Sequence, residues 1–133
     1  MRRYLKMKYI LSFLLIAASF LFVQCSDNVD KKLQEYVKKA NETSPRQLDQ
    51  WTRFDSCSVA AGRTIRQYHT IAGIVVTDTA VFKSNMESSL FSMVKTSPNL
   101  SYFRKNDVTL IYQYNDEEGK YLFSMIVKPE NYK

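Results

Sequence analysis

The feature that most constrains this chain is an apolar run of fourteen residues, from Ile10 to Val23, that ends two residues before Cys25. Basic residues precede the run, and a polar segment follows it. A transmembrane helix needs roughly 20 apolar residues, whereas the core of an export signal takes about 7–15. The length of the run therefore favours an export signal, and an uncleaved N-terminal anchor is the alternative.

The segment before Cys25 resembles the signal of a bacterial lipoprotein, in which apolar and small residues precede an acylated cysteine. Gln24 departs from this pattern at the position before the cysteine, and Phe22 is bulkier than the usual residue. This looser form, with a polar and acidic start after the cysteine, is similar to lipoproteins of Bacteroidota-type bacteria. The resemblance implies a signal peptide over residues 1–24 and lipidation of Cys25. An ordinary secretory signal that leaves Cys25 free is the alternative.

The resemblance also implies where the protein would lie. More than one acyl chain on the cysteine gives a stable membrane attachment, whereas a single chain binds only reversibly. The expected location is the outer membrane, with the domain facing the periplasm or the cell surface.

The net charge of +6 belongs mostly to the predicted signal. Cleavage before Cys25 removes four basic residues and no acidic residue, so the charge falls by four to +2; the residues removed are Arg2, Arg3, Lys6 and Lys8. A nucleic-acid binder needs a clustered basic face rather than a small surplus of charge. We therefore do not expect nucleic acid as a partner.

The mature part is long enough for one domain with a modest core. We expect a tether and N-terminal helix over residues 25–45 and an α+β domain over residues 46–133. The helix, over residues 27–40, has one apolar stripe at the helical period and should pack on that domain.

Hydrophobic spacing predicts the remaining elements of the domain. We expect strands at 52–59 and 64–77, a helix at 78–96, and strands at 108–114 and 121–127. Because the strands come in adjacent pairs, the predicted fold is an antiparallel sheet of two β-hairpins. Two helices should pack on one face of this sheet, in the order α-β-β-α-β-β.

The helix at 78–96 carries an apolar stripe at the helical period, which consists of Phe82, Met86, Leu90, Met93 and Val94. Methionines at helical spacing are more often core residues than a binding groove, although they suit both. Thr77 or Asp78 is expected to cap the helix. The triplet that Asp78 begins, Asp-Thr-Ala, also resembles the O-glycosylation motif of Bacteroidota-type bacteria, and the capping role is the stronger interpretation.

A second resemblance covers most of residues 41–133. It is to small bacterial exported proteins without an assigned activity. The residues that carry it are scattered turn-formers and strand aromatics: Asn41, Pro45, Asp49, Thr52, Gly62, Tyr68, His69, Thr70, Tyr112, Gln113, Tyr114, Asp116, Gly119, Pro129, Glu130, Asn131 and Tyr132. It implies one compact α+β domain and no particular chemistry.

One pair of residues could serve nucleophilic catalysis. A hairpin centred near Gly62 would bring Cys57 opposite His69, with Asp55 or Asp49 to orient the imidazole. The alternative, which we favour, is a small buried thiol and an ordinary strand histidine. We therefore do not expect an enzyme, and a small thiol-dependent enzyme is the alternative hypothesis.

No metal or cofactor is expected. The chain has one histidine, and one imidazole with one thiol provides too few ligands for a typical zinc site. Its three glycines lie far apart in the sequence, so it lacks a glycine-rich phosphate-binding loop. Asp116, Glu117 and Glu118 crowd one predicted turn, which is typical of a solvated hairpin tip.

The favoured function is a lipid-anchored, non-catalytic binding module of the cell envelope, with a protein or glycan partner. Its predicted binding surface combines Arg66 and Tyr68 with Tyr112 and Tyr114, because tyrosine offers a large contact area at little entropic cost. We expect at least three of these four side chains to be exposed. An inhibitor of an envelope enzyme is a further alternative.

Overall fold

The computed structural model describes residues 28–133, so the predicted signal peptide and the lipidation site at Cys25 lie outside the described residues. The chain divides into two compact units, Met1–Lys32 and Leu33–Lys133, and the fold described below is that of the second. Within the described part of the chain, no helix combines the length and the apolar character that crossing a membrane requires.

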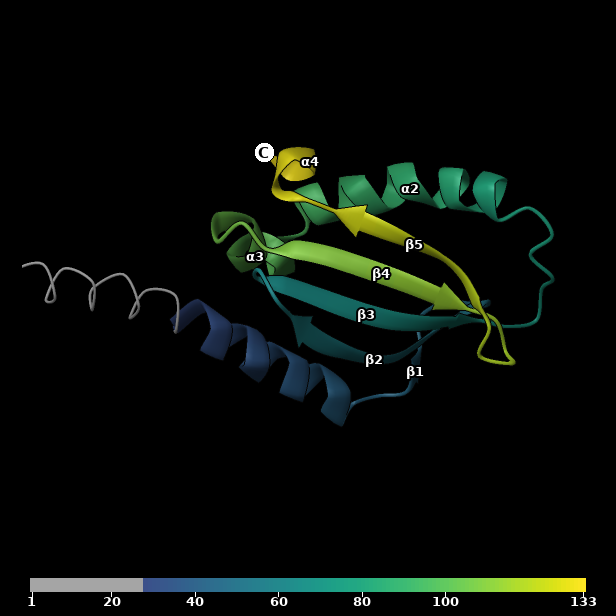
Figure 1. Cartoon of the computed structure of the whole chain (residues 1–133), viewed down its shortest axis with the longest axis horizontal. Coiled ribbons are helices and arrows are strands. Elements are labelled where there is room, and N and C mark those ends of the chain that lie inside the picture. The colour runs from purple at the N-terminus through teal and green to yellow at the C-terminus, as the bar shows by residue number, and fades with distance from the viewer. Residues whose placement is uncertain (1–27) are drawn as a thin grey trace, which may run out of the picture. The chain divides into compact units, whose positions relative to one another are not determined.

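The second unit is built on a five-stranded sheet whose spatial order follows the chain, from β1 to β5 (Figure 1). The strands are β1 (Arg46–Gln47), β2 (Thr52–Ala60), β3 (Thr64–Ile71), β4 (Thr109–Asn115) and β5 (Tyr121–Val127). The helical segments of this unit are residues 33–42, which continue a helix that begins at residue 28, and α2 (Thr79–Thr96), η1 (Pro98–Leu100), α3 (Ser101–Lys105) and α4 (Pro129–Tyr132). The predicted α+β class is confirmed.

The prediction of a wholly antiparallel sheet is wrong, because β3 and β4 pair in parallel. The two predicted hairpins exist as β2–β3 and β4–β5, and β1 adds a short antiparallel edge. Parallel neighbours need a long crossover, which α2 and the segments around it provide between β3 and β4. The chain therefore returns to the starting end of β3, where the Thr109 amide donates to the Arg63 carbonyl at 3.0 Å.

A β-bulge interrupts β2 between Phe54 and Ser56. One extra residue at this point moves the following side chains to the other face of the sheet. Phe54 and Cys57 therefore lie on the same face although they are three residues apart. The bulge explains why apolar and polar residues alternate unevenly in this strand.

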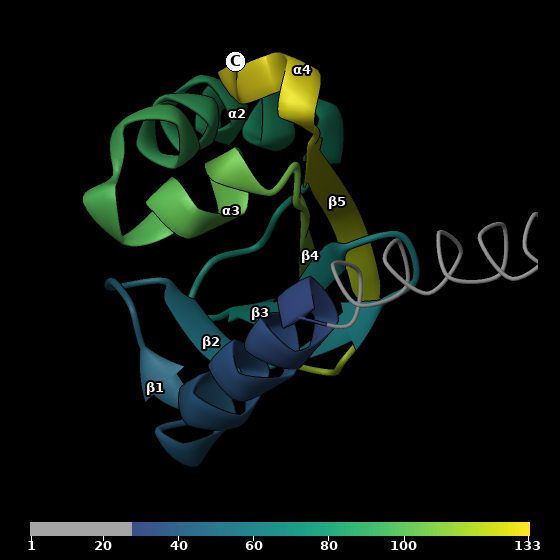
Figure 2. The same ribbon diagram turned by 90° about the vertical axis from the view of Figure 1, so that its left-hand side faces the viewer.

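One face of the sheet is covered by helices. Tyr36, in the helix of residues 28–42, makes an edge-to-face contact with Phe103 of α3, with ring centroids 4.8 Å apart. Phe82 of α2 approaches Phe123 of β5 at 6.0 Å. Residues 33–42 lie near β2 and β3 whereas α2 lies near β5, as Figure 2 shows.

The first of these helices is held to β2 by the side chain of Asn41. Its Nδ2 donates to the Cys57 carbonyl at 2.9 Å, and its Oδ1 accepts from the Cys57 amide at 2.8 Å. These are the two bonds that a neighbouring strand would make. Asn41 therefore takes the place of a strand partner beyond the short β1.

We expect Asn41→Asp to destabilise the protein by about 1–3 kcal/mol, because a carboxylate cannot donate to the Cys57 carbonyl and leaves it unpaired. Urea unfolding monitored by circular dichroism measures the loss. Thr43→Ala is the matched control, since Thr43 is exposed near the end of the same helix. Equal stability of the Asn41→Asp and wild-type proteins would contradict this role.

Both ends of α2 are capped. The Asp78 carboxylate accepts from the Val81 amide at 3.0 Å, which confirms the predicted N-cap. At the other end, Arg104 of α3 donates to the carbonyls of Val94 and Ser97, at 2.8 and 2.7 Å. A cation at a helix C-terminus also interacts favourably with the helix dipole.

Candidate functional site

A single row of side chains crosses all five strands on the covered face. The register places Arg46, Phe54, His69, Tyr114 and Phe123 side by side from β1 to β5. The Arg46 guanidinium lies 4.3 Å from the centre of the Phe54 ring. The rings of Tyr114 and Phe123 stack with centroids 4.9 Å apart. This row forms the floor on which the candidate site is built.

His69 occupies the middle of this row. Its ring stacks on Tyr114 at 5.0 Å and on Tyr112 at 5.9 Å, and it meets the edge of Phe54 at 5.7 Å. The side chain is only 2 % exposed, and within residues 28–133 its Nδ1 atom has no hydrogen-bond partner. Burial lowers the pKa of His69 to about 4, so the imidazole is neutral at pH 7.

A groove opens over this histidine, between Tyr36, in the helical residues 33–42, and the C-terminal half of α2. Its volume is about 320 Å³. Besides His69, its apolar and aromatic lining consists of Tyr36, Leu48, Leu90, Met93, Leu100, Tyr112 and Tyr114. Its polar lining residues are Gln67, Ser97 and Asn99. A second hollow of about 380 Å³ continues along α2 and shares Leu90, Met93 and Tyr114 with the first.

The lining residues of both hollows include no Asp, Glu, Lys or Arg among the residues that the structure describes. Burial also raises the pKa of the tyrosines in the groove, to about 12 for Tyr114 and in the same direction for Tyr36 and Tyr112. The hydroxyl groups and the imidazole are therefore all uncharged at neutral pH. The groove presents an uncharged surface with a few polar atoms.

The apolar stripe of α2 lines this groove instead of filling a core. Val94 is the only buried residue of the helix, and Met93 is 43 % exposed. The prediction that the methionines are core residues is therefore wrong for Met93. The structure instead agrees with the alternative prediction, in which the methionines line a groove. Periodicity identified the stripe, but it could not show how far the helix stands from the sheet.

The predicted binding surface is not formed, because its four residues lie on opposite faces of the sheet. The parallel register pairs Tyr112 with Gln67 and Tyr114 with His69, on the covered face. Both tyrosines are buried, so the expectation of three exposed side chains is wrong.

Arg66 and Tyr68 lie on the other, open face and are half-buried. There the Arg66 guanidinium donates to the Gln113 side chain at 3.1 Å. The face that each tyrosine occupies depends on the pairing of β3 with β4, which residue spacing alone does not reveal.

The predicted opposition of Cys57 and His69 is also wrong. The bulge in β2 pairs Cys57 with Gln67 and pairs His69 with Phe54. Burial raises the pKa of the Cys57 thiol, which disfavours the nucleophilic thiolate. The lowered pKa of His69 likewise makes it a weaker base, so neither group is tuned for nucleophilic catalysis.

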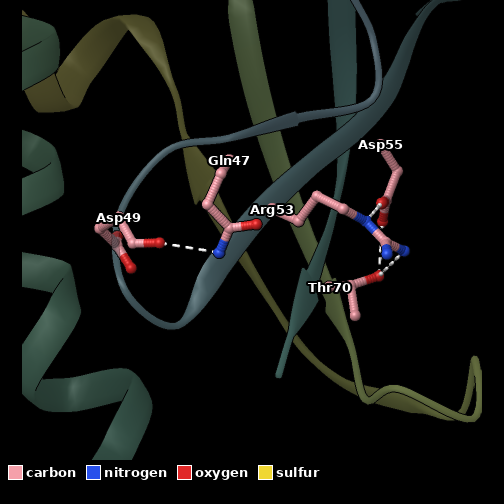
Figure 3. A network of polar contacts seen from close by, with 5 residues as sticks. All are labelled: Gln47, Asp49, Arg53, Asp55 and Thr70. Carbon is pink, nitrogen blue, oxygen red and sulfur yellow. Dashed lines mark hydrogen bonds and ion pairs between the residues drawn. The ribbon is translucent and has the colours of Figure 1, made fainter. Parts of the chain in front are cut away.

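The open face near the bulge carries a small polar network, shown in Figure 3. Asp55 forms an ion pair with Arg53 at 2.6 Å and accepts from the Thr70 hydroxyl at 2.6 Å. In the turn between β1 and β2, Asp49 accepts from the amides of Trp51 and Thr52, both at 2.8 Å. Asp55 thus binds partners in β2 and β3, and Asp49 binds two amides at the start of β2. Neither carboxylate is a hydrogen-bond partner of His69 in the described part of the chain.

The acidic turn between β4 and β5 is held in the same way. Asp116 accepts from the backbone amides of Glu118 and Lys120, at 3.0 and 2.8 Å. Over residues 28–133, no three His, Cys, Asp or Glu side chains come together as a metal site would require.

These features define a small α+β protein with an aromatic, uncharged groove on the covered face of its sheet. The chain belongs to the family described as a domain of unknown function, DUF8479, whose model matches residues 25–123. No curated protein matches the sequence.

Two solved structures share the fold. One is a protein of Pseudomonas aeruginosa described as "a putative secreted protein", with a TM-score of 0.66 and 13 % identity. The other is EpsS, the pilotin of the Vibrio vulnificus type 2 secretion system, with a TM-score of 0.65 and 7 % identity. Each match covers 80 % of this chain and 94 % of the other chain.

Proposed function

We propose that this protein is a lipid-anchored, non-catalytic binding module of the cell envelope, and that its binding site is the groove over His69. The observation that carries this proposal is the placement of α2. An amphipathic helix of a small domain normally buries its apolar stripe, because such a domain has little core to spare. Here the stripe lines an open groove, where a partner could cover it.

The two structural neighbours support an envelope role through what their names state. One is described as secreted, and the other is a pilotin of a secretion system. A pilotin neighbour favours a protein over a glycan as the partner. The apolar and aromatic residues that line the groove agree with a protein partner, since residues that anchor a partner in a pocket carry much of the binding energy of protein interfaces.

The binding proposal predicts that a charge in the groove abolishes partner capture. Met93→Glu places a carboxylate on the groove, and Ile126→Glu places one on β5, on the open face of the sheet. The two positions are similarly exposed, at 43 % and 47 %, so both variants should fold. In-envelope crosslinking followed by mass spectrometry should recover one partner with the wild-type and Ile126→Glu proteins, and lose it with Met93→Glu.

The opposite pattern, with capture lost only in Ile126→Glu, would move the site to the open face. Equal capture by all three proteins would remove the groove from the proposal. Circular dichroism of each variant separates lost binding from lost folding.

The anchor has its own test. We expect metabolic labelling with a palmitate analogue to mark the wild-type protein and to leave Cys25→Ala unlabelled, because Cys25 is the proposed acylation site. The family match, which begins at residue 25, supports a mature domain that starts at this cysteine. Cys57→Ala is the matched control and should label fully, since Cys57 is buried in the fold. Absence of label on the wild-type protein would overturn the anchor.

A further inference from the structure

The charged side chains of this domain are separated along the direction of the strands. One end of the sheet brings together the β2–β3 turn, the last turn of α2, α3 and α4, and Figure 2 views the molecule from this end. Arg63 of the β2–β3 turn donates to the Asn106 carbonyl, just after α3, at 3.3 Å. Arg104 of α3 caps the C-terminus of α2, and the Tyr132 hydroxyl of α4 donates to the Val108 carbonyl at 2.7 Å. We call this the basic end.

Basic side chains outnumber acidic ones at the basic end. Residues 61–63, 95–108 and 128–133 contain six basic and two acidic side chains, which leaves a surplus of four positive charges. The basic residues are Arg63, Lys95, Arg104, Lys105, Lys128 and Lys133, and the acidic residues are Asp107 and Glu130. All four lysines are exposed. Within residues 28–133, Lys133 is the one of the four that forms an ion pair, with Asp107 at 2.7 Å.

The opposite end of the sheet carries the reverse charge, and we call it the acidic end. It consists of residues 48–51, 72–78 and 115–120, where the Ala72 amide donates to the Trp51 carbonyl at 2.8 Å and Val75 and Glu117 line the same hollow. Its charged residues are Asp49, Asp78, Asp116, Glu117, Glu118 and Lys120. Because β4 between the two ends has seven residues, the opposite charges lie about 20 Å apart.

The chain enters the domain at the basic end. Tyr36 contacts Phe103 of α3 with ring centroids 4.8 Å apart, and Leu33, the first residue of the second unit, comes three residues earlier. Cys25 precedes Leu33 by eight residues, which span at most about 29 Å when fully extended. A lipid anchor at Cys25 therefore keeps the basic end close to the membrane surface.

Anionic phospholipid headgroups are the partner that this arrangement favours. Each lysine or arginine near an anionic membrane surface strengthens binding about fivefold. The tether makes the contact intramolecular, so a weak attraction is enough at the high effective concentration. The acidic end lies more than two Debye lengths away at physiological salt, where the Debye length is about 8 Å, so screening removes most of its repulsion. A free acidic protein lacks the advantage of the tether.

We propose that the basic end docks on anionic phospholipid headgroups of the membrane that holds the anchor, and that the acidic end is turned away from this membrane. The inference rests on the proposed anchor at Cys25. It goes beyond the groove, because it assigns an orientation to the whole domain.

The test measures which end of the domain touches lipid headgroups. The full chain is reconstituted in nanodiscs of phosphatidylcholine alone, or of phosphatidylcholine and phosphatidylglycerol in equal amounts, with a nitroxide on some of the headgroups. A fluorophore is attached at Ala61→Cys in the β2–β3 turn or at Val75→Cys in the acidic end, since both positions are exposed. We expect quenching at position 61 in the anionic nanodiscs only, and no quenching at position 75. Raising the salt to about 1 M shortens the Debye length to about 3 Å and should abolish the quenching.

Lys105→Glu and Lys120→Glu form a matched pair of variants. Both lysines are exposed and both substitutions change the net charge by the same amount, but Lys105 lies at the basic end and Lys120 at the acidic end. Lys105→Glu should lower the ratio of docked to undocked domains about 25-fold, because it removes a positive charge and adds a negative one near the lipid surface. Lys120→Glu should leave this ratio unchanged.

Equal quenching at position 61 in neutral and anionic nanodiscs, quenching at position 75, or unchanged docking of Lys105→Glu overturns the proposal. Absence of quenching at both positions also overturns it, and leaves the basic end free for an acidic protein instead. The anchor and the orientation fail separately. A wild-type protein that takes up no palmitate analogue rejects the anchor, whereas a palmitate-labelled protein without quenching rejects only the orientation.

Discussion

Lowering the pH from 7 to 4 should destabilise the folded protein by about 3 kcal/mol through His69 alone. The unfolded chain binds a proton at this histidine below pH 6.5, its ordinary pKa, whereas the folded chain binds one only near pH 4. Between these values the unfolded state holds more protons, so stability rises with pH. The contribution is therefore complete at pH 7 and is lost as the pH falls through this window.

Urea unfolding at pH 7, 5.5 and 4.5 measures this effect in the wild-type and His69→Phe proteins. The variant should lose most of the pH dependence in this window, because its ring stays in the row and has no proton to bind. The backbone amide of Trp51 holds the pKa of Asp49 below its ordinary value of 3.8, so Asp49 acts at lower pH than His69. An unchanged slope between pH 6.5 and 4 in the variant would show that His69 is not buried in neutral form.

Leu110→Ala should destabilise the protein by about 3–4 kcal/mol. Leu110 lies in β4 with an exposed fraction of 0 %, between Ile65 of β3 and Val127 of β5 in the register. Both neighbours are also fully buried. Truncation removes the transfer free energy of the side chain and leaves a cavity that a sheet cannot easily close.

Ile111→Ala is the matched control for this prediction. Ile111 is the next residue of the same strand, but it points to the open face and is half-buried. We expect a loss of about 1 kcal/mol there, because less apolar area is removed from the protein interior. Urea midpoints at pH 7 compare the two variants. Equal losses would mean that the helices do not cover the face of the sheet assigned here.

The sequence predicted the main helices and strands well, but it did not predict how the strands pair in the sheet. The α2 bounds and its Asp78 cap follow from local signals, namely apolar residues at the helical period and a side chain that accepts from a free amide. The expected strand at 64–77 instead ends at Ile71, and Gly73 follows with a φ of +75°. Such a conformation suits glycine and interrupts a strand.

The residues that form the groove could not be predicted from the sequence, because the strand pairing decides which side chains share a face of the sheet. His69 and the two tyrosines share a face because β3 and β4 are parallel, and Cys57 joins that face because of a bulge. A shift of one residue in either pairing would exchange the two faces of a strand. Apolar spacing specifies which residues are buried together only after the pairing is known. The short elements β1, α3 and α4 were missed because they are too brief to show a period.

The parallel pairing of β3 and β4 has a consequence for how this protein reaches its native state. Each hairpin forms from residues that are close in the chain, but the two hairpins join only after residues 72–108 have been brought around. Closing a long connection slows folding relative to local contacts. Until it closes, one side of β3 exposes unpaired amide and carbonyl groups to other chains. The order of assembly therefore leaves this edge of β3 open to pairing with other chains until α2 and its flanking segments are in place.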